Sequence, residues 1–522
     1  MAANIRFEPP KIYLDVEKEV IFMDSDNGGS STTKKITLGG LVLMIFSSVF
    51  GFSNSLTAYY QMGYGSIIWY IFAAIVFFLP VSMMMAEYGA TFKAAKGGIF
   101  SWLSGSIGEK PAFIGTFIWL SSWVVWLVSS TQYFLVSVST TIFGHDQTSH
   151  WSLFGLSSLK TLGILEVAFI LVVTFFASRG INNIAKVTAV GGFFSLAIPV
   201  IFIVASFILL IMNGGHLAQP MTAASFVKSP NPNFVSPIAI ISFVVYAIFA
   251  YGGLETMGGV TDSLDNPEKT FPRGLTIAMI VMTSLYLIAI LACGFSANWA
   301  HDLGGKSTNL ANVEYVLINN LGVTLGDKLG FSHAGALLCG KLFSQLTALS
   351  DVLGGLGAAF VMVYSPVKSL ILGCDPRLLP KYLTKLNKHD MPEHVMWIQA
   401  AIVIVIVLAI SFGGKTANVF YTILTDMMNV SSSAPYLFLV AAFPFFKMKK
   451  NLDRPFVFFK SVRSSWVISI IVWLVVAVGI IFTCVEPLLQ GDPTTAFWTA
   501  FGPVLFGIIG WILYDLADRH AE

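Results

Sequence analysis

Two stretches of the sequence decide the fold: Leu-Val-Leu-Met-Ile-Phe-Ser-Ser-Val-Phe-Gly-Phe-Ser-Asn-Ser at 41–55, and Ile-Ala-Ile-Ile-Ser-Phe-Val-Val-Tyr-Ala-Ile-Phe-Ala-Tyr-Gly-Gly at 238–253. Each is an apolar run that ends at glycine, and in the first stretch serine and asparagine follow. Glycine, serine and asparagine are all weak helix formers. Lipid cannot hydrogen-bond an opened backbone, so non-helical chain at this depth must be buried in protein or line a cavity. The pattern therefore predicts two transmembrane helices that are broken near mid-membrane.

The rest of the chain is equally apolar. Of its 522 residues 55% are hydrophobic and 11% are charged, and the mean hydropathy is +0.76. A soluble domain carries about 25% charged residues, so a single membrane domain is favoured. A helix needs about twenty mostly apolar residues to cross the hydrocarbon. On this criterion we expect an all-α membrane protein of about twelve spans, near 37–62, 67–89, 111–137, 161–178, 185–212, 236–261, 274–296, 333–364, 395–412, 417–445, 465–485 and 495–515.

The distribution of lysine and arginine predicts the orientation, because short cytoplasmic loops are enriched in both. With the N-terminus inside, most of the 30 basic residues fall on the inner side. We therefore expect both termini to be cytoplasmic. Residues 1–35 are predicted to be a tail without the apolar run of a cleavable signal peptide. Residues 36–517 are predicted to be the transporter domain, and 518–522 the cytosolic C-terminus.

The breaks fall in the first and sixth predicted spans, which indicates two inverted repeats of five helices with the binding site at the breaks. A helix that begins after a break offers N–H groups to a carboxylate, and one that ends before it offers carbonyl oxygens to an ammonium. Glycines also serve close helix packing alone, and aromatic residues serve core packing, so that alternative stays open. The candidate substrate-binding residues are Gly51, Phe52, Ser53, Asn54, Phe249, Ala250, Tyr251, Gly252 and Gly253.

Ionisable residues at membrane depth are expensive and usually functional. Glu255 follows the second break and is a candidate proton carrier or gate, with a static hydrogen-bonded carboxylate as the alternative. Asp351 is a candidate partner for a substrate amine. Lys341 lies about 15 Å from it along one helix, too far to pair, and we expect it to snorkel outward. Glu166 and Asp426 are weaker candidates.

The sequence gives no sign of a metal or cofactor site. The four cysteines show no CxxC spacing, and all eight histidines lie in or beside predicted loops. A membrane enzyme needs a catalytic constellation near an interface, and a channel needs a charged ring or a carbonyl filter. Neither pattern is found, so a carrier of a small molecule in the lipid bilayer is favoured, with no nucleic-acid partner.

The break motifs resemble those of the amino acid–polyamine–organocation superfamily. Gly51-Phe52-Ser53 stands where the superfamily carries its Gly-Ser-Gly unwinding motif. The run from Phe249 to Glu255, followed by Asn266-Pro267, is similar to its sixth-span pattern, and Gly97–Trp102 after Glu87 looks like its first cytoplasmic loop. Within the superfamily the chain resembles the glutamate:GABA antiporter family most, in the short sequence segments at 229–232, 247–253 and 435–439.

This resemblance implies a five-plus-five inverted-repeat fold with two extra helices and alternating access around spans one and six. It implies that Gly51–Ser53 meet a substrate carboxylate, that the backbone of Phe249–Gly252 meets the amine, and that Phe249 and Glu255 act at gates. Proton-coupled relatives carry a lysine in span five where we align Ser195, which favours exchange or coupling through Glu255.

A sodium symporter of the same fold stays the runner-up. Glutamate, GABA, a neutral amino acid and a small amine such as ethanolamine all stay open as substrates.

Overall fold

The computed structural model describes residues 35–92, 98–179, 184–257, 264–305, 307–374, 378–389, 391–413 and 416–519. Most of the predicted tail and the last three residues of the chain lie outside these ranges. Ten helices of the described part are long and apolar enough to cross a membrane. The apolar part of α8 (Ile184–Met212) and the pair α1 (Leu38–Val49) and α2 (Phe52–Met62) complete the predicted set of spans. The predicted all-α membrane fold is confirmed.

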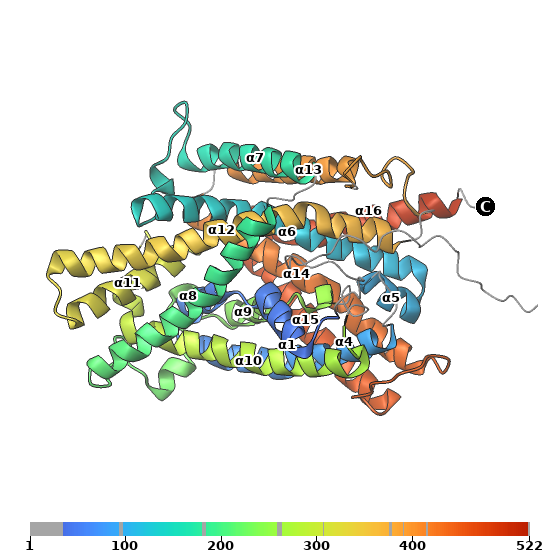
Figure 1. Ribbon diagram of the computed structural model, residues 1–522, viewed down its shortest axis with the longest axis horizontal. Coiled ribbons are helices and arrows are strands. Elements are labelled where there is room, and N and C mark those ends of the chain that lie inside the picture. Colours follow the sequence, from blue (N-terminus) through green and yellow to red (C-terminus); the bar gives the residue numbers. More distant parts are fainter. Residues whose placement is uncertain are drawn as a thin grey trace, which may run out of the picture. The chain divides into compact units, whose positions relative to one another are not determined.

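The remaining spans follow the predicted order (Figure 1). In chain order they are α3 with η1 and α4 (Gly65–Ala73, Ala74–Phe78, Leu79–Thr91), α6 (Glu109–Phe143), α7 (Ser158–Ala177), α9 (Pro237–Ala250), α10 (Pro267–Ser296), α12 (His333–Gly373), α13 (Glu393–Ser411), α14 (Ala417–Met448), α15 (Val462–Leu489) and α16 (Pro493–Arg519).

Several helices differ from the predicted spans at their ends. α6 and α12 run well beyond 111–137 and 333–364, and α14 runs three residues beyond the predicted end at 445. Two further helices, α5 (Ile99–Ile107) and α11 (Val313–Lys328), lie in segments that we predicted as loops. Both are too short to cross the hydrocarbon, so the hydropathy pattern of whole spans did not mark them. Short 3-10 helices occur at Thr148–His150, Ala223–Phe226 and Pro232–Phe234, and a π turn at Trp299–Leu303.

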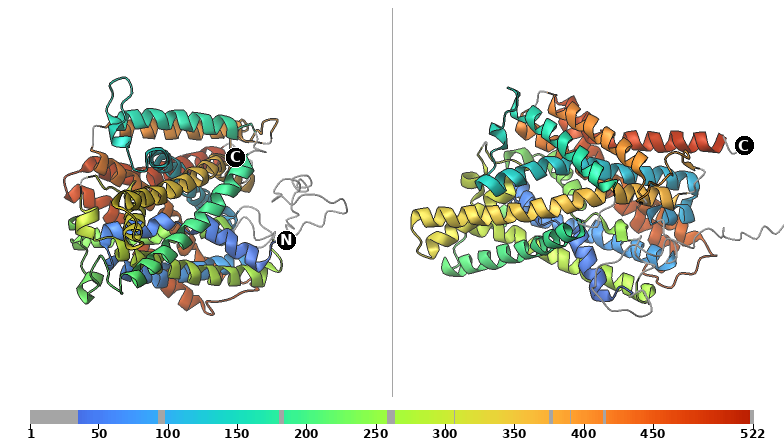
Figure 2. Two further views of the ribbon diagram at one scale, coloured as in Figure 1. Left: turned by 60° about the vertical axis from the view of Figure 1, so that its left-hand side comes forward. Right: turned by 45° about the horizontal axis from the view of Figure 1, so that its top comes forward.

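The broken helices lie among helices that come from both halves of the chain. α10 packs against α1, α2 and α4, and α9 packs against α14 and α15. α7 and α13 lie side by side at one edge of the helix bundle, far from one another in sequence (Figures 1 and 2). Leu41, Leu56, Tyr70 and Tyr286 are fully buried, so the core surrounds the breaks.

A short backbone contact joins the beginning of the first span to the segment after the second break. Ile36 and Leu264 form a parallel bridge, and the Asp265 N–H donates to the Ile36 carbonyl at 3.0 Å. Thr37 then caps α1 by accepting a hydrogen bond from the Gly40 N–H at 3.3 Å, as threonine does at helix N-termini. The entrance to α1 is thereby fixed beside the start of α10.

Candidate functional site

The first predicted break is confirmed at Phe50 and Gly51. α1 ends with the Phe50 N–H on the Phe46 carbonyl, and α2 begins with Gly51 as its N-cap. A Cβ at Gly51 would lie 2.7 Å from the Asn54 amide nitrogen, so a larger residue would force Asn54 to move. The N–H groups of Phe52 and Ser53 open α2 and have no acceptor within the helix.

The second predicted break is confirmed after Ala250. Tyr251 and Gly252 turn back on the last carbonyls of α9, through N–H···O contacts of 3.0 and 2.9 Å to Ile248 and Phe249. Gly253 has a φ of +108°, which a residue with a side chain rarely adopts. One turn of 3-10 helix follows at 254–257. The remainder of the predicted span, 258–261, lies outside the described residues.

One tyrosine holds the two breaks together. The Tyr286 hydroxyl, from the middle of α10, accepts the Gly51 N–H at 3.1 Å and donates to the Ala250 carbonyl at 2.7 Å. Its ring lies 4.8 Å from Phe50 and 5.4 Å from Tyr251, measured between centroids. Two polar backbone groups that we predicted to be open for a solute are therefore occupied by this hydroxyl.

Further tyrosines bind the backbone just inside α2. The Asn54 carbonyl accepts hydrogen bonds from the hydroxyls of Tyr70 and Tyr246, both at 3.1 Å. The Tyr251 hydroxyl donates to the Tyr70 carbonyl at 3.3 Å. The breaks are therefore surrounded by aromatic rings that also carry hydrogen-bonding groups.

The second span contains a π-helical turn, Ala74–Phe78, opposite the second break. Phe78 stacks on Tyr251 with a centroid distance of 4.5 Å, and Phe77 meets Tyr436 edge-on at 5.0 Å. π turns inside α-helices are rare and occur frequently at functional sites. Nothing in the apolar sequence of this span indicated the turn.

Glu255 lies directly beneath the second break and is 7% exposed. One carboxylate oxygen accepts the Trp119 indole N–H at 3.3 Å, and the other accepts the Tyr436 hydroxyl at 2.5 Å and the Gly253 N–H at 3.1 Å. The same Gly253 N–H also lies 2.8 Å from the Tyr436 oxygen. All three of these partners are neutral donors, so the carboxylate is satisfied without a cation from the described chain.

Asp351 lies in a separate polar group formed by α6, α11 and α12. The Tyr315 hydroxyl donates to Asp351 at 2.8 Å and contacts the Ser137 hydroxyl at 2.7 Å. Glu314 is near enough to interact with Asp351, and burial together with this neighbour raises the pKa of the Glu314 carboxyl. The position of Glu314 beside Asp351 was not predicted. Lys341, on the same helix as Asp351, is exposed.

The weaker candidates lie elsewhere. Glu166 is almost fully buried in α7, and one of its oxygens has no hydrogen-bond partner within the described part of the chain. Asp426, in α14, is partly buried. The side chain of Ser195, the residue aligned with the lysine of proton-coupled relatives, lies outside the described set. Among the described residues no group of three His, Cys, Asp or Glu side chains is placed to hold a metal ion.

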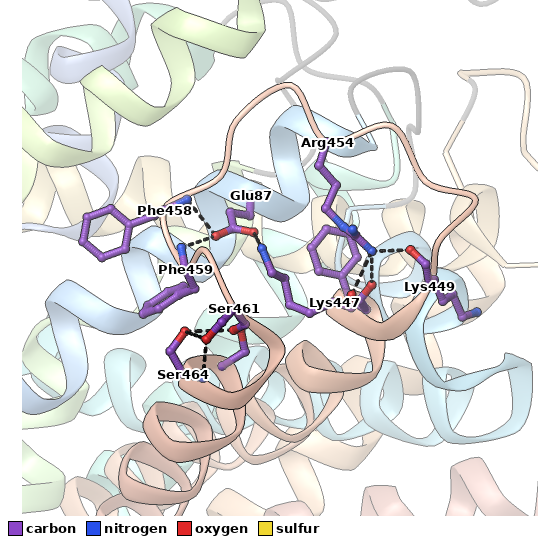
Figure 3. A network of polar contacts seen from close by, with 10 residues as sticks. Glu87, Lys447, Lys449, Arg454, Phe458, Phe459, Ser461 and Ser464 are labelled. Carbon is purple, nitrogen blue, oxygen red and sulfur yellow. Dashed lines mark hydrogen bonds and ion pairs between the residues drawn. The ribbon is translucent and has the colours of Figure 1, made fainter.

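A buried ion pair at the other end of the second span was also missed (Figure 3). The Lys447 ammonium lies 2.6 Å from the Glu87 carboxylate, with side-chain exposures of 5% and 0%. The second Glu87 oxygen accepts the N–H groups of Phe458 and Phe459 at 2.9 and 2.8 Å. The predicted span ended at 445, before Lys447, but α14 extends past this residue and carries it into the protein.

The predicted substrate-binding residues differ in exposure. Ser53 is exposed, Gly51, Asn54, Phe249, Gly252 and Gly253 are partly exposed, and Phe52, Ala250 and Tyr251 are buried. Phe52 packs against Phe202 of α8 at 5.2 Å between ring centroids. The structure brings the two breaks and Glu255 together, whereas Asp351 belongs to the neighbouring Tyr315 group.

Comparison with known proteins agrees with this architecture. The chain is 46% identical over 485 residues to the inner membrane transporter YjeM of Escherichia coli strain K12, covering 93% of this chain and 96% of that protein. It is 22% identical over 499 residues to the aspartate/glutamate permease AcaP of Lactococcus lactis subsp. cremoris, covering 94% and 96%. It is 24% identical over 498 residues to the glutamate/gamma-aminobutyrate antiporter of Lactococcus lactis subsp. lactis, covering 94% and 92%.

The family model described as amino acid permease matches residues 36–513. The resemblance inferred from the break motifs is therefore confirmed. With its broken helices, its apolar spans and these relatives, the chain belongs to the amino acid permease family and is a multi-pass membrane protein of transporter type.

Proposed function

We propose that this protein is a secondary transporter that moves an amino acid or a small amine across the bacterial inner membrane by alternating access and exchange. The observation that carries the proposal is the Tyr286 hydroxyl, which binds Gly51 of one break and Ala250 of the other. A solute that binds between the breaks competes for the same two backbone groups. Binding and rearrangement of the breaks are thereby linked.

The chemistry of the breaks suits a zwitterion. The N–H groups of Phe52 and Ser53 begin α2, where the helix dipole favours a carboxylate. The carbonyls at the end of α9 and the partly exposed Phe249 ring suit an ammonium, through hydrogen bonds and a cation–π contact. Asp351 offers a second, charged position for an amine in the Tyr315 group.

Glu255 is proposed as the gate or proton-coupling carboxylate. Its hydrogen bond to Tyr436 and its contact with the Gly253 N–H tie it to the second break. A carboxyl held only by neutral donors is costly to leave charged at this depth. Loss or gain of its proton would change its hydrogen bonds to the break, which gives a route for coupling transport to pH.

Exchange is favoured because one of the relatives is named an antiporter. The antiporter from Lactococcus lactis is named for glutamate and gamma-aminobutyrate, one of which bears a net negative charge. Symport driven by protons or sodium is the second candidate, and the position of Glu255 favours the proton form over the sodium form. We further propose that both termini are cytoplasmic, as the basic loops predict.

Counterflow into proteoliposomes tests the proposal. Vesicles containing the purified protein are loaded with glutamate, GABA, a neutral amino acid or ethanolamine, and entry of the same labelled compound is followed. For the true substrate we expect saturable uptake that accelerates when the vesicle is loaded, with no requirement for sodium. Uptake that does not saturate for any compound, or an ohmic current, would refute a carrier.

The Glu255→Gln variant separates the role of the carboxylate from that of the fold. The amide retains the size of the side chain but cannot be protonated, so we expect the pH dependence of net uptake to flatten while substrate still raises the melting temperature. Tyr436→Phe is the matched control, because it removes one donor to Glu255 and leaves the carboxyl. An unchanged pH profile in Glu255→Gln would exclude coupling through this residue.

A further inference from the structure

A cavity of about 570 Å³ lies where the end of α7 meets the beginning of α13, away from both breaks. The two helices are side by side in Figures 1 and 2. Its described lining is polar and half of it is basic: Ser178, Arg179, Asn387, Lys388, His389 and Glu393. No part of the proposed transport mechanism uses this cavity.

The basic side chains of the cavity are available for an anion. Among the described residues, the side chains of Arg179, Lys388 and His389 have no hydrogen bond or ion pair. The Arg179 guanidinium packs over the Phe175 ring, 3.9 Å from its centroid, and its N–H groups have no acceptor within the described part of the chain. The one acid, Glu393, accepts a hydrogen bond from the Asn387 amide at 3.1 Å. The described lining therefore carries more basic than acidic side chains.

The wall of the cavity is built by hydrogen bonds within the chain. The Asn387 side-chain nitrogen donates to the Ser178 carbonyl at 2.6 Å, which fixes the loop to the end of α7. The Asn387 side-chain oxygen accepts the N–H groups of His389 and Met391 at 2.9 and 3.1 Å. These bonds hold Lys388 and His389 opposite Arg179 without any ligand, so the site is preorganised.

The neighbouring surface is apolar rather than polar. Val172 and Phe176 of α7 are 53% and 52% exposed, and Ile398 of α13 is 42% exposed. In the loop that carries Lys388, Leu386 is 41% exposed. Val172, Phe176 and Ile398 lie on helices that cross the membrane, so they face hydrocarbon. A ligand with an anionic headgroup and an apolar tail complements both the basic cavity and the apolar surface beside it. A soluble anion complements the basic cavity alone.

We propose that this cavity binds the headgroup of an anionic phospholipid, with its phosphate between Arg179 and Lys388 and its acyl chains along α7. Arginine is suited to phosphate because its planar guanidinium donates two parallel hydrogen bonds. The loop before α13 also carries Lys381 and Lys385, and the positive-inside pattern assigns this side to the cytoplasmic leaflet. Basic pockets between membrane helices on that side bind anionic headgroups.

Lipid nanodiscs with defined composition test this site. The intact protein is placed in phosphatidylcholine discs, with or without phosphatidylglycerol, and its melting temperature and the lipids retained in native mass spectrometry are measured. For the unchanged protein we expect a retained phosphatidylglycerol and a higher melting temperature. Arg179→Gln and Lys388→Gln should each lower the preference for the anionic lipid about fivefold, and the double variant about twenty-five-fold.

Lys160→Gln is the matched control, since Lys160 lies at the opposite end of α7 and also packs over a phenylalanine, with 5.5 Å to the Phe412 centroid. We expect this variant to keep the full lipid preference. An equal loss in Lys160→Gln, or no loss in the double variant, would overturn the proposal. So would an equal thermal shift from inorganic phosphate in pure phosphatidylcholine discs, because the ligand would then be a soluble anion.

Discussion

The Glu87–Lys447 ion pair gives the sharpest stability prediction. Both charges are buried, and removing one partner of a buried pair costs about 3–5 kcal/mol because the other charge is left uncompensated. Lys447→Met leaves Glu87 with the N–H groups of Phe458 and Phe459, so we expect a loss of about 3 kcal/mol. Glu87→Gln leaves the buried ammonium without the carboxylate charge and with the Phe443 ring, 5.9 Å away at its centroid, as a cation–π contact, so we expect a loss of about 5 kcal/mol.

The double variant should be more stable than either single variant. With both charges gone, the desolvation penalty is gone as well, and neutral replacements of buried pairs are often close to neutral in stability. We therefore expect the double-mutant cycle to return a coupling energy of several kcal/mol, well above the additivity error of about 0.5 kcal/mol. The assay is denaturant unfolding in mixed micelles, followed by tryptophan fluorescence.

The chain contains a matched control at its surface. Lys110 and Asp515 have the same 2.6 Å nitrogen–oxygen distance, but their side chains are 44% and 31% exposed. Exposed pairs contribute about 0–1 kcal/mol, so Lys110→Met should cost no more than that. If Lys447→Met and Lys110→Met cost the same, or if the buried double variant loses the sum of its two singles, the reasoning from burial is refuted.

Three further predictions concern the breaks and the Tyr315 group. Tyr286→Phe removes one hydrogen bond to each break, so it should lower the free energy of unfolding by about 2 kcal/mol and alter substrate affinity. Tyr60→Phe is the control, because it removes a hydrogen bond to the Thr308 carbonyl and should leave affinity unchanged in the same binding assay. Gly253→Ala forces a side chain to a φ of +108° and should cost about 1–3 kcal/mol, whereas Gly39→Ala, with open space around it, should be neutral or stabilising by thermal shift. Because burial and Asp351 raise the pKa of Glu314 above its ordinary 4.5, the folded state binds the proton more tightly, so stability should fall as pH rises above 4.5; Glu314→Gln should flatten that part of the melting-temperature profile, and an unchanged slope would exclude this residue as its source.

The positions of the breaks were predictable because their causes are local. Glycine follows an apolar run at Gly51 and at Gly252. Non-helical backbone at membrane depth occurs only where it is buried in protein or lines a cavity. The carboxylate of Glu255 was identifiable for the same reason, since a charged residue at that depth stands out in the sequence. These features depend on a few neighbouring residues and on the membrane as a solvent.

The partners of the breaks were not predictable because they come from distant parts of the chain. Tyr286 is 235 residues from Gly51, and Tyr436 is 181 residues from Glu255. In a chain with 14% aromatic residues, a tyrosine inside an apolar span gives no sign that its hydroxyl serves a particular backbone group. Lys447 was hidden by its basic neighbours, which made a buried cation look like part of a positive loop.

The isolated parallel bridge between Ile36 and Leu264 joins two residues that are more than two hundred positions apart in the chain. It couples the beginning of α1 to the beginning of α10, so a tilt of α1 acts directly on α10. The hydroxyl of Tyr286 lies further along that same α10. A displacement at the beginning of α1 is therefore transmitted along α10 to Tyr286, which contacts both helix breaks.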